Sequence, residues 1–344
     1  MPIEKRWVVK PQGDKVAVEA LASSLQMSPV LANLLVQRGI DTVEKARKFF
    51  SPSLRDLHNP FLMKNMDRAV ERIEEAVREN QTVMIYGDYD VDGTTAVALV
   101  YKFLRQIGHQ NLLFYIPDRY VDGYGISIRS IDHAVRKGVK LVIALDCGIK
   151  AVEKVAYANE RGVDFIICDH HLPAEEIPAA VAVLDPKRTD CTYPFDELSG
   201  CGVGFKLVQA YAQRNHIPFK EIEHLLDLLV VSIASDIVPL VDENRILAYY
   251  GLRKLNSNPT EGLLSIIKIC GLEGHNITID DIVFKIGPRI NAAGRMRMEE
   301  EDAAPSGGHA AVSLLIEGNE REAQRFGEII NAYNDDRKSI DRNV

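Results

Sequence analysis

A regular alternation between short apolar runs and amphipathic segments begins at residue 82 and limits the possible folds of this chain more than any other feature. The apolar runs have the length of buried strands and lie at 82–87, 111–116, 140–145, 163–168 and 181–184. The segments between them have helical spacing near 94–107, 127–137 and 150–161. Strands that alternate with helices form a parallel sheet covered by helices on both faces. The sequence therefore predicts an α/β fold with a parallel sheet.

Helical patterns flank this region on both sides. Before it, apolar residues recur at the helical spacings of three and four over 16–21, 30–38, 43–50 and 67–79. After it, helices are predicted at 202–215, 219–234 and 319–343. The segment GPRINAAGR is typical of a glycine-rich turn, and 297–309 of a loop. We expect a helical N-terminal segment (1–80), an α/β catalytic domain (81–255), a helical and loop extension (256–318) and the start of a long connecting helix (319–344).

Composition argues against several classes of protein. The hydrophobic content of 46% and the charged content of 26% are those of an ordinary globular protein. The sequence has no bilayer-length apolar run and no signal-peptide core, so we expect a cytoplasmic protein that binds no membrane. The five cysteines are odd in number and lack CxxC spacing, which argues against disulfides and structural zinc. The net charge of −8 argues only weakly against nucleic acid, because phosphate binding needs just a local basic groove.

Potential metal ligands follow several of the predicted strands. Three alternate aspartates in GDYDVDG follow the first strand, one aspartate follows the third, and the sequence Asp-His-His follows the fourth. Because ligands bind at the carboxyl ends of the strands in such sheets, we expect these groups to share one edge. Another aspartate ends the apolar stretch 225–237, either as a helix cap or as a ligand. The candidates are Asp88, Asp90, Asp92, Asp146, His170, His171 and Asp236.

This set of side chains requires a cation. Close carboxylates repel one another and raise one another's pKa values unless a positive charge lies among them. Oxygen ligands with one or two imidazoles favour Mn²⁺ or Mg²⁺ over a thiolate-type zinc site. The carboxylates exceed the needs of one ion, and two ions about 3.5–4 Å apart stabilise the attacking and leaving oxygens in displacement at phosphorus. We therefore expect two divalent cations and hydrolysis of a phosphoester or phosphoanhydride.

Each element of the set has a simpler explanation when it is taken alone. The aspartate triplet could be a calcium loop or an exposed acidic turn, although an EF-hand loop needs a glutamate at its twelfth position and none is present. A His-His pair is more often a surface or capping pair, and Asp236 alone is more often a helix cap. Their recurrence at one sheet edge favours metal-dependent hydrolysis over these explanations.

Several segments resemble one known family. GDYDVDGTTA, ALDCGI, CDHHLP and SDIVPL are similar to the motifs of the RecJ branch of the DHH phosphoesterase superfamily. RGIDTVEKARKFFSP and GPRINAAGRM extend the resemblance over most of residues 30–296. The resemblance implies a DHH domain with 5′-to-3′ exonuclease activity on single-stranded DNA, used in repair and recombination and dependent on two Mn²⁺ or Mg²⁺ ions. It also implies a monomer whose partners include single-strand-binding protein and a helicase.

The resemblance further implies roles for the metal candidates. Asp90 and Asp92 correspond to ligands of the first motif, one mainly for each ion. Asp146 corresponds to a ligand that bridges the two ions. His170 and Asp236 correspond to ligands of the second ion.

Two positions near these ligands carry less certain roles in the family. Many relatives have a histidine where this chain has Tyr86, and Asp88 is expected to take its place as a ligand. His171 is expected to contact the scissile phosphate or to orient the site. The expected catalytic residues are therefore Asp146, His170 and His171.

Expected contacts to DNA lie in two segments. Arg289, Asn291 and Arg295 correspond to a family segment that contacts the DNA backbone, and arginine forks suit phosphate oxygens. Arg119 and Tyr124 are expected to line the substrate channel, since aromatic rings in a basic groove bind single strands without sequence preference.

The chain departs from the family pattern at its end. Relatives continue into a DHH-associated domain with a Gly-Gly-His motif and then into an oligonucleotide-binding barrel, whereas this chain ends at Val344. We expect Gly307-Gly308-His309 to be a chance match, because it precedes the connecting helix. Two alternatives therefore stay open: a phosphoesterase acting on short oligonucleotides or cyclic dinucleotides, and a truncated, non-catalytic DNA-binding fragment.

Overall fold

The computed structural model describes residues 6–295 and 307–343, and it describes no side chain for Arg295 or for 340–343. The chain divides into two compact units, Met1–Leu57 and His58–Val344. The first unit contains α1 (Lys15–Leu25), α2 (Pro29–Val36), α3 (Val43–Phe50) and the short turn η1 (Leu54–Asp56). Its helices pack around a small core of Leu21, Ala32, Leu35, Ile40 and Ala46. The predicted N-terminal helices are thus confirmed.

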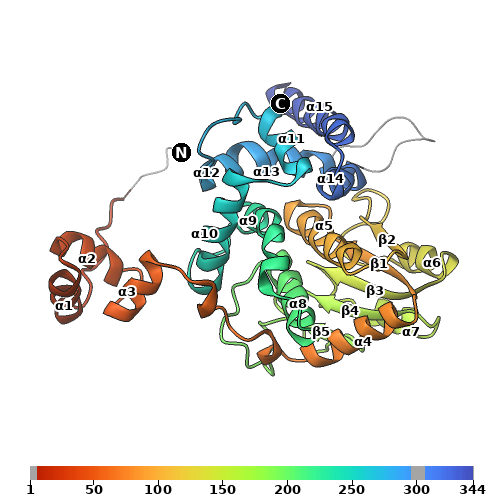
Figure 1. The fold of residues 1–344 in the computed structure, drawn as a ribbon, viewed down its shortest axis with the longest axis horizontal. Coiled ribbons are helices and arrows are strands. Elements are labelled where there is room, and N and C mark those ends of the chain that lie inside the picture. The colour runs from red at the N-terminus through yellow and green to blue at the C-terminus, as the bar shows by residue number, and fades with distance from the viewer. Residues whose placement is uncertain (1–5, 296–306, 344) are drawn as a thin grey trace. The chain divides into compact units, whose positions relative to one another are not determined.

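The second unit is built on a five-stranded parallel sheet with strand order β2-β1-β3-β4-β5 (Figure 1). The strands are β1 (Thr82–Gly87), β2 (Leu112–Tyr115), β3 (Val139–Leu145), β4 (Asp164–Cys168) and β5 (Ala182–Leu184). All five coincide with predicted strands to within two residues at each end, and the predicted α/β fold class is confirmed. The apolar runs predicted them well because both faces of the sheet are buried.

Helices cover both faces of the sheet, as Figure 1 shows. On one face, α6 (Ile128–Arg136) and α7 (Val152–Asn159) share a core with alternate strand residues such as Met84, Val142 and Phe165. The other face is covered by α4 (Met66–Arg78), α5 (Val91–Gln106) and α8 (Gly200–Arg214). Helix α4 therefore lies in the second unit, although the sequence pattern grouped it with the N-terminal segment; the domain limits given above stay a prediction.

The strand order places a switch point between β1 and β3. The chain leaves β1 toward β2 on one side, whereas β3 and the later strands lie on the other side. The register pairs Gly87 with Leu145, and Leu145 with Cys168, so that β1, β3 and β4 end at the same level. Ligand sites of open parallel sheets form at such a point.

The remaining regular elements of the described residues are helices and helical turns. Besides the turn η2 (Pro60–Leu62), they comprise η3 (Phe219–Glu221), η4 (Glu223–Leu225), α9 (Leu226–Ser235), α10 (Asp242–Ser257), α11 (Glu261–Ile269), α12 (Ile279–Asp281), η5 (Ile282–Ile286), α13 (Gly287–Arg295), α14 (Gly307–Ile316) and α15 (Glu320–Asn343). The charged C-terminal helix is confirmed. The helix predicted at 219–234 is instead two short turns followed by α9. The predicted loop at 297–309 lies largely outside the described residues, and its last three residues begin α14.

The glycine-rich turn predicted at Gly287–Arg295 is wrong, because this segment is the helix α13. A π-helical segment, Ile282–Ile286, leads into it, next to Pro288, which has no N–H to donate to a regular helix. A Cβ placed on Gly294 would lie 2.1 Å from the carbonyl oxygen of Tyr89. The glycine therefore allows a close approach between the helix and the loop after β1, rather than a turn.

No helix in the described part of the chain has the length and apolar character needed to span a membrane. All five cysteines are unpaired, in agreement with the expectation from their number and spacing.

Candidate metal centre

The loop after β1 carries three aspartates into the start of α5. Asp90 is the N-cap of this helix, and its side chain accepts a hydrogen bond from Gly93 N at 3.0 Å. Asp92 lies in the first turn of the same helix, where the helix dipole favours a negative charge. Asp88 and Asp92 are buried. The short loop and the helix start thus aim acidic groups at the crevice between β1 and β3.

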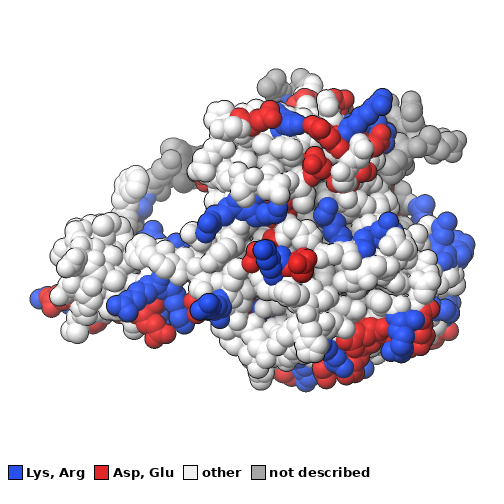
Figure 2. All heavy atoms as spheres, in the orientation of Figure 1, with Lys and Arg blue, Asp and Glu red and all other residues white. Residues whose placement is uncertain are grey.

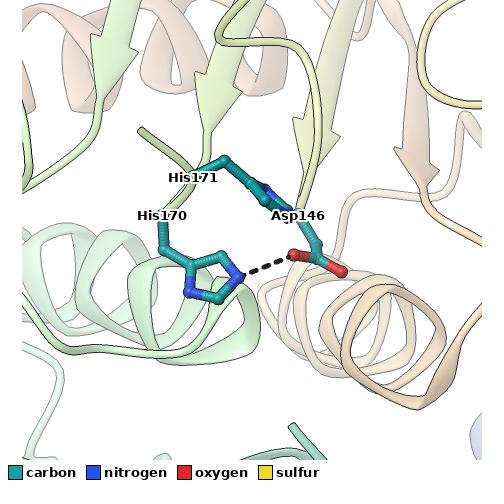
Figure 3. Close-up of side chains that lie close together, drawn as sticks. All are labelled: Asp146, His170 and His171. Carbon is teal, nitrogen blue, oxygen red and sulfur yellow. Dashed lines mark ion pairs between the residues drawn. The ribbon is translucent and has the colours of Figure 1, made fainter. Parts of the chain in front are cut away.

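The structure brings all seven metal candidates together. They form three overlapping groups, and in each group the potential ligand atoms lie within 4.8 Å of one another. His170 connects the ends of β1, β3 and α9: its Nε2 lies 3.2 Å from Asp146 Oδ1, 3.7 Å from Asp92 Oδ2 and 3.8 Å from Asp236 Oδ2. Figure 3 shows the approach of His170 to Asp146, with His171 beside them. The groups are Asp88-Asp90-Asp146, Asp92-His170-Asp236 and Asp146-His170-His171.

The electrostatics of the cluster oppose ionisation of three of its carboxyls. Burial, followed by the charge of Asp90, raises the pKa of Asp88 to about 7. Burial, followed by the charge of Asp92, raises the pKa of Asp236 to about 7. The same two causes raise the pKa of Asp146 well above its ordinary value. A bound cation would relieve both the burial cost and the repulsion.

The residues fit a pair of hard divalent cations. Asp88 Oδ1 is buried and makes no hydrogen bond within the described structure, and buried polar atoms normally have partners. The donor set is mostly carboxylate oxygen with one or two imidazoles, which suits Mn²⁺ or Mg²⁺. Asp236 also ends α9 as its C-cap residue, which confirms one of the two explanations suggested by the sequence, while its role as a ligand stays a prediction.

Asp169 contacts the cluster, although the sequence analysis did not single it out as a candidate. Its buried Oδ1 lies 2.7 Å from His171 Nδ1. This hydrogen bond is the leading cause of the raised pKa of His171. Burial alone would raise the pKa of Asp169, but its bonds with His171 and with Ile149 N outweigh burial and lower it. Its position directly before the histidine pair was the available sequence signal.

A loop after β2 lies over the cluster and carries one predicted substrate contact. Tyr124 OH is 3.4 Å from His171 Nε2. Tyr86, on β1, holds this loop in place. Its buried OH donates a hydrogen bond to Gly125 O at 2.7 Å, and its ring stacks on that of Tyr115 with 5.5 Å between the ring centres. Tyr86 therefore points into this loop and not toward the ligands.

The other predicted substrate contact of this loop, Arg119, lies against the loop after β1. Its guanidinium carbon is 5.6 Å from the centre of the Tyr89 ring. This arrangement places a cation and an aromatic ring next to the ligand aspartates.

Helix α13 presents the remaining predicted DNA contacts. Asn291 Oδ1 accepts a hydrogen bond from Val91 N at 3.0 Å, at the N-terminus of α5. Arg289 donates to Lys285 O at 2.7 Å and to Asn331 Oδ1 at 3.1 Å. The side chain of Arg295 lies outside the described residues. The contacts show that α13 supports the ligand loop, while its role toward DNA stays a prediction.

Gly307-Gly308-His309 forms the start of α14. A Cβ on Gly307 would lie 1.8 Å from Ala293 O. Burial lowers the pKa of His309 to about 4, and its ring centre is 5.3 Å from that of Phe114. These contacts give the segment a packing role between α13 and the sheet.

Comparisons with known proteins agree with this geometry. Residues 82–233 match the family model described as the DHH family, N-terminal domain. The chain is 39% identical over 336 residues to the single-stranded-DNA-specific exonuclease RecJ of Bacillus subtilis, an alignment that covers 97% of this chain and 40% of that protein. The chain thus spans less than half the length of this relative.

Two solved structures are similar over most of the chain. RecJ from Thermus thermophilus in complex with Mn²⁺ aligns with a TM-score of 0.80 at 25% identity, over 96% of this chain and 46% of that one. An exonuclease RecJ bound to manganese aligns with a TM-score of 0.73 at 28% identity, over 84% of this chain and 69% of that one. Residues 82–233 therefore match the N-terminal domain of the DHH family, and the chain is similar to the RecJ exonucleases over almost its whole length.

Proposed function

We propose that this chain hydrolyses phosphodiester bonds of single-stranded DNA as a 5′-to-3′ exonuclease that requires two Mn²⁺ or Mg²⁺ ions. The observation that carries the proposal is the overlap of the three ligand groups. Asp146 and His170 each belong to two groups, so the groups form one continuous cluster. That pattern suits two neighbouring cations joined by a shared carboxylate. The similarity to proteins named single-stranded-DNA-specific exonuclease RecJ supports the proposed substrate class, and the proposed direction rests on the resemblance of the sequence motifs to the RecJ branch.

Divalent cations at such a site polarise the phosphodiester and activate water for in-line attack. The chain's own residues then have separate tasks. Asp146 and His170 join the ligand groups. His171, held by Asp169 through Nδ1, keeps Nε2 available on the side of Tyr124. Because Asp169 favours the protonated imidazole, Nε2 can donate a hydrogen bond to a phosphate oxygen.

Single-strand binding would use the surface around Tyr124 and Arg119. An aromatic ring next to a cation binds successive bases and phosphates without sequence readout. On the face shown in Figure 2, Lys and Arg side chains gather in several groups although the net charge is −8. Arg289, Asn291 and Arg295 would extend this surface along α13. Local positive charge of this kind is sufficient to attract a phosphate backbone.

The biological setting is part of the proposal and rests on the resemblance to the RecJ branch. We place the chain in the cytoplasm, as a monomer that acts in DNA repair and recombination. Single-strand-binding protein and a helicase are the proposed partners.

The test is degradation of 5′-labelled single-stranded DNA by the purified chain with Mn²⁺, beside a duplex and a dinucleotide. Release of 5′ mononucleotides from the single strand, abolished by EDTA and by Asp146→Asn, is expected. Asp67→Asn, an exposed carboxylate on α4, is the matched control and should retain activity.

Two results would replace this proposal by an alternative. Cleavage of the dinucleotide alone would indicate a phosphoesterase for short substrates. DNA binding without cleavage, at any Mn²⁺ concentration, would indicate a non-catalytic fragment.

A further inference from the structure

The carboxylate of Asp92 is held by three hydrogen bonds from two helices that follow it far along the chain. Gly200 N donates to Oδ2 at 2.6 Å, and Cys201 N donates to Oδ1 at 2.8 Å. Ser232 Oγ donates to Oδ1 at 2.7 Å. Asp92 is only 2% exposed, so water does not compete for these bonds. The first two donors belong to the N-terminus of α8, where unpaired N–H groups attract an anion.

The hydrogen bonds leave Asp92 little capacity for other partners. An ionised carboxylate offers about four lone-pair positions, two on each oxygen. Cys201 N and Ser232 Oγ occupy both positions on Oδ1, and Gly200 N occupies one on Oδ2. The remaining position on Oδ2 lies on the side of the cluster, because Oδ2 is 3.7 Å from His170 Nε2. Asp92 can therefore offer one oxygen to a cation.

The same backbone segment also contacts the second key carboxylate. A Cβ placed on Gly200 would lie 2.6 Å from both Cβ and Oδ1 of Asp146. Gly200 thus leaves no space for a side chain next to Asp146, and its N–H donates to Asp92. No larger residue fits between these two carboxylates without moving one of them.

A serine pair locks this segment in place. Ser199 is the N-cap of α8, and its Oγ accepts a hydrogen bond from Gly202 N at 3.0 Å. The same Oγ lies 2.7 Å from Ser232 Oγ on α9. The donors to Asp92 are therefore joined to one another and cannot shift independently.

We propose that Ser199, Gly200, Cys201 and Ser232 form a clamp that positions Asp92 to bind a cation through Oδ2 alone and that fixes its spacing from Asp146. The inference rests on the proposed metal centre and assigns positioning residues that do not themselves touch the metal or the DNA. Residues that orient metal ligands typically change metal affinity or activity about 10–100-fold when they are altered.

The test compares Gly200→Ala with Gly202→Ala in the full chain. Both glycines lie in the first turn of α8, but the nearest atoms to a Cβ on Gly202 are at an ordinary 3.4 Å. Mn²⁺ affinity is measured by calorimetric titration and by the free-Mn²⁺ electron paramagnetic resonance signal. Gly200→Ala should weaken binding at least about 10-fold, and Gly202→Ala should leave it unchanged.

A second pair of variants covers the case in which Gly200→Ala fails to fold. Ser232→Ala removes one donor to Asp92 and should weaken Mn²⁺ about 10-fold, lowering kcat while KM for single-stranded DNA stays constant. Ser265→Ala is the control, because this buried serine on α11 has no hydrogen-bond partner in the described structure. Wild-type Mn²⁺ affinity in Ser232→Ala would overturn the clamp. A wild-type chain that binds no Mn²⁺ would instead overturn the metal centre itself.

Discussion

Oδ1 of Asp169 accepts hydrogen bonds from the backbone N–H groups of both His170 and His171, at 2.8 Å and 3.2 Å, while it holds the His171 ring. Its Oδ2 accepts the N–H of Ile149 at 2.9 Å. One buried carboxylate thus joins the ends of β3 and β4 and orients the imidazole that faces outward. Its removal should affect both the fold of the site and the chemistry.

Asp169→Asn should lower kcat about 10–100-fold, with a smaller change in KM. The amide cannot stabilise the protonated His171 ring, so the pKa of His171 should fall. As the pH rises, the activity that depends on the protonated ring should then be lost at a lower pH than in the wild type. The pH dependence of kcat measures this shift. In a His171→Ala background, Asp169→Asn should cause little further loss of kcat, and an equal additional loss would show that Asp169 acts independently of the ring.

The metal-free protein should become less stable as the pH rises from about 4 to above 7. Asp88 and Asp236 have folded-state pKa values of about 7, against 3.8 for the ordinary group. The folded state therefore binds more protons than the unfolded state between these two pKa values. These protons stabilise the folded state at low pH, and this contribution is lost once the pH exceeds about 7. Thermal melts in EDTA at several pH values measure the trend, and Asp88→Asn should flatten it. A melting temperature that rises over this interval would contradict the assignment.

Mn²⁺ should restore the stability lost at higher pH. At a free concentration one hundred times its Kd, a ligand that binds only the folded state adds about 2.7 kcal/mol to the free energy of unfolding. The increase in melting temperature upon addition of Mn²⁺ should therefore be larger at pH 8 than at pH 5, because protons compete for the same carboxylates. An equal increase at both pH values would argue against binding at this cluster.

Asp146→Asn and Asp146→Ala should differ in stability although both abolish activity. Asp146 has a φ of 59°, a left-handed conformation that Asn tolerates and Ala does not, so the Ala variant should be less stable by about 1 kcal/mol. Urea unfolding in EDTA measures the difference. Equal stabilities would show that the conformation of the backbone relaxes in the variants.

Tyr86→Phe should raise KM for single-stranded DNA with little change in Mn²⁺ affinity. The variant keeps the stack on Tyr115 but loses the bond to Gly125 O, which fixes the loop that carries Tyr124. The free energy of unfolding should fall by about 1 kcal/mol. A lower kcat with an unchanged KM would instead place Tyr86 in the metal centre.

The sequence predicted the strands and the clustering of the candidate ligands for one physical reason. A buried parallel strand must be apolar along its length, so polar side chains at its carboxyl end stand out, and Asp146 and His170 could be recognised from their position alone. The position of Asp236 beside them was less certain, since a helix end accounts for the same residue.

Other parts of the site could not be predicted because they depend on contacts between distant segments. The donors to Asp92 come from residues 108, 109 and 140 positions later. Two of these donors are backbone N–H groups, which every residue except proline has. The helix α13 was missed because Gly294 is there for close packing, whereas local preference alone associates glycine with turns.

The contact between Asn291 Oδ1 and Val91 N joins the proposed DNA-binding helix to the loop that carries the ligands. A strand of DNA that moves α13 on binding must also change the position of that loop and hence the affinity for the cation. Thermodynamic linkage requires the reverse effect to be of the same size: the cation must alter the affinity for DNA by the same factor. Titrations with DNA at two cation concentrations, and with the cation at two DNA concentrations, should therefore yield the same coupling factor.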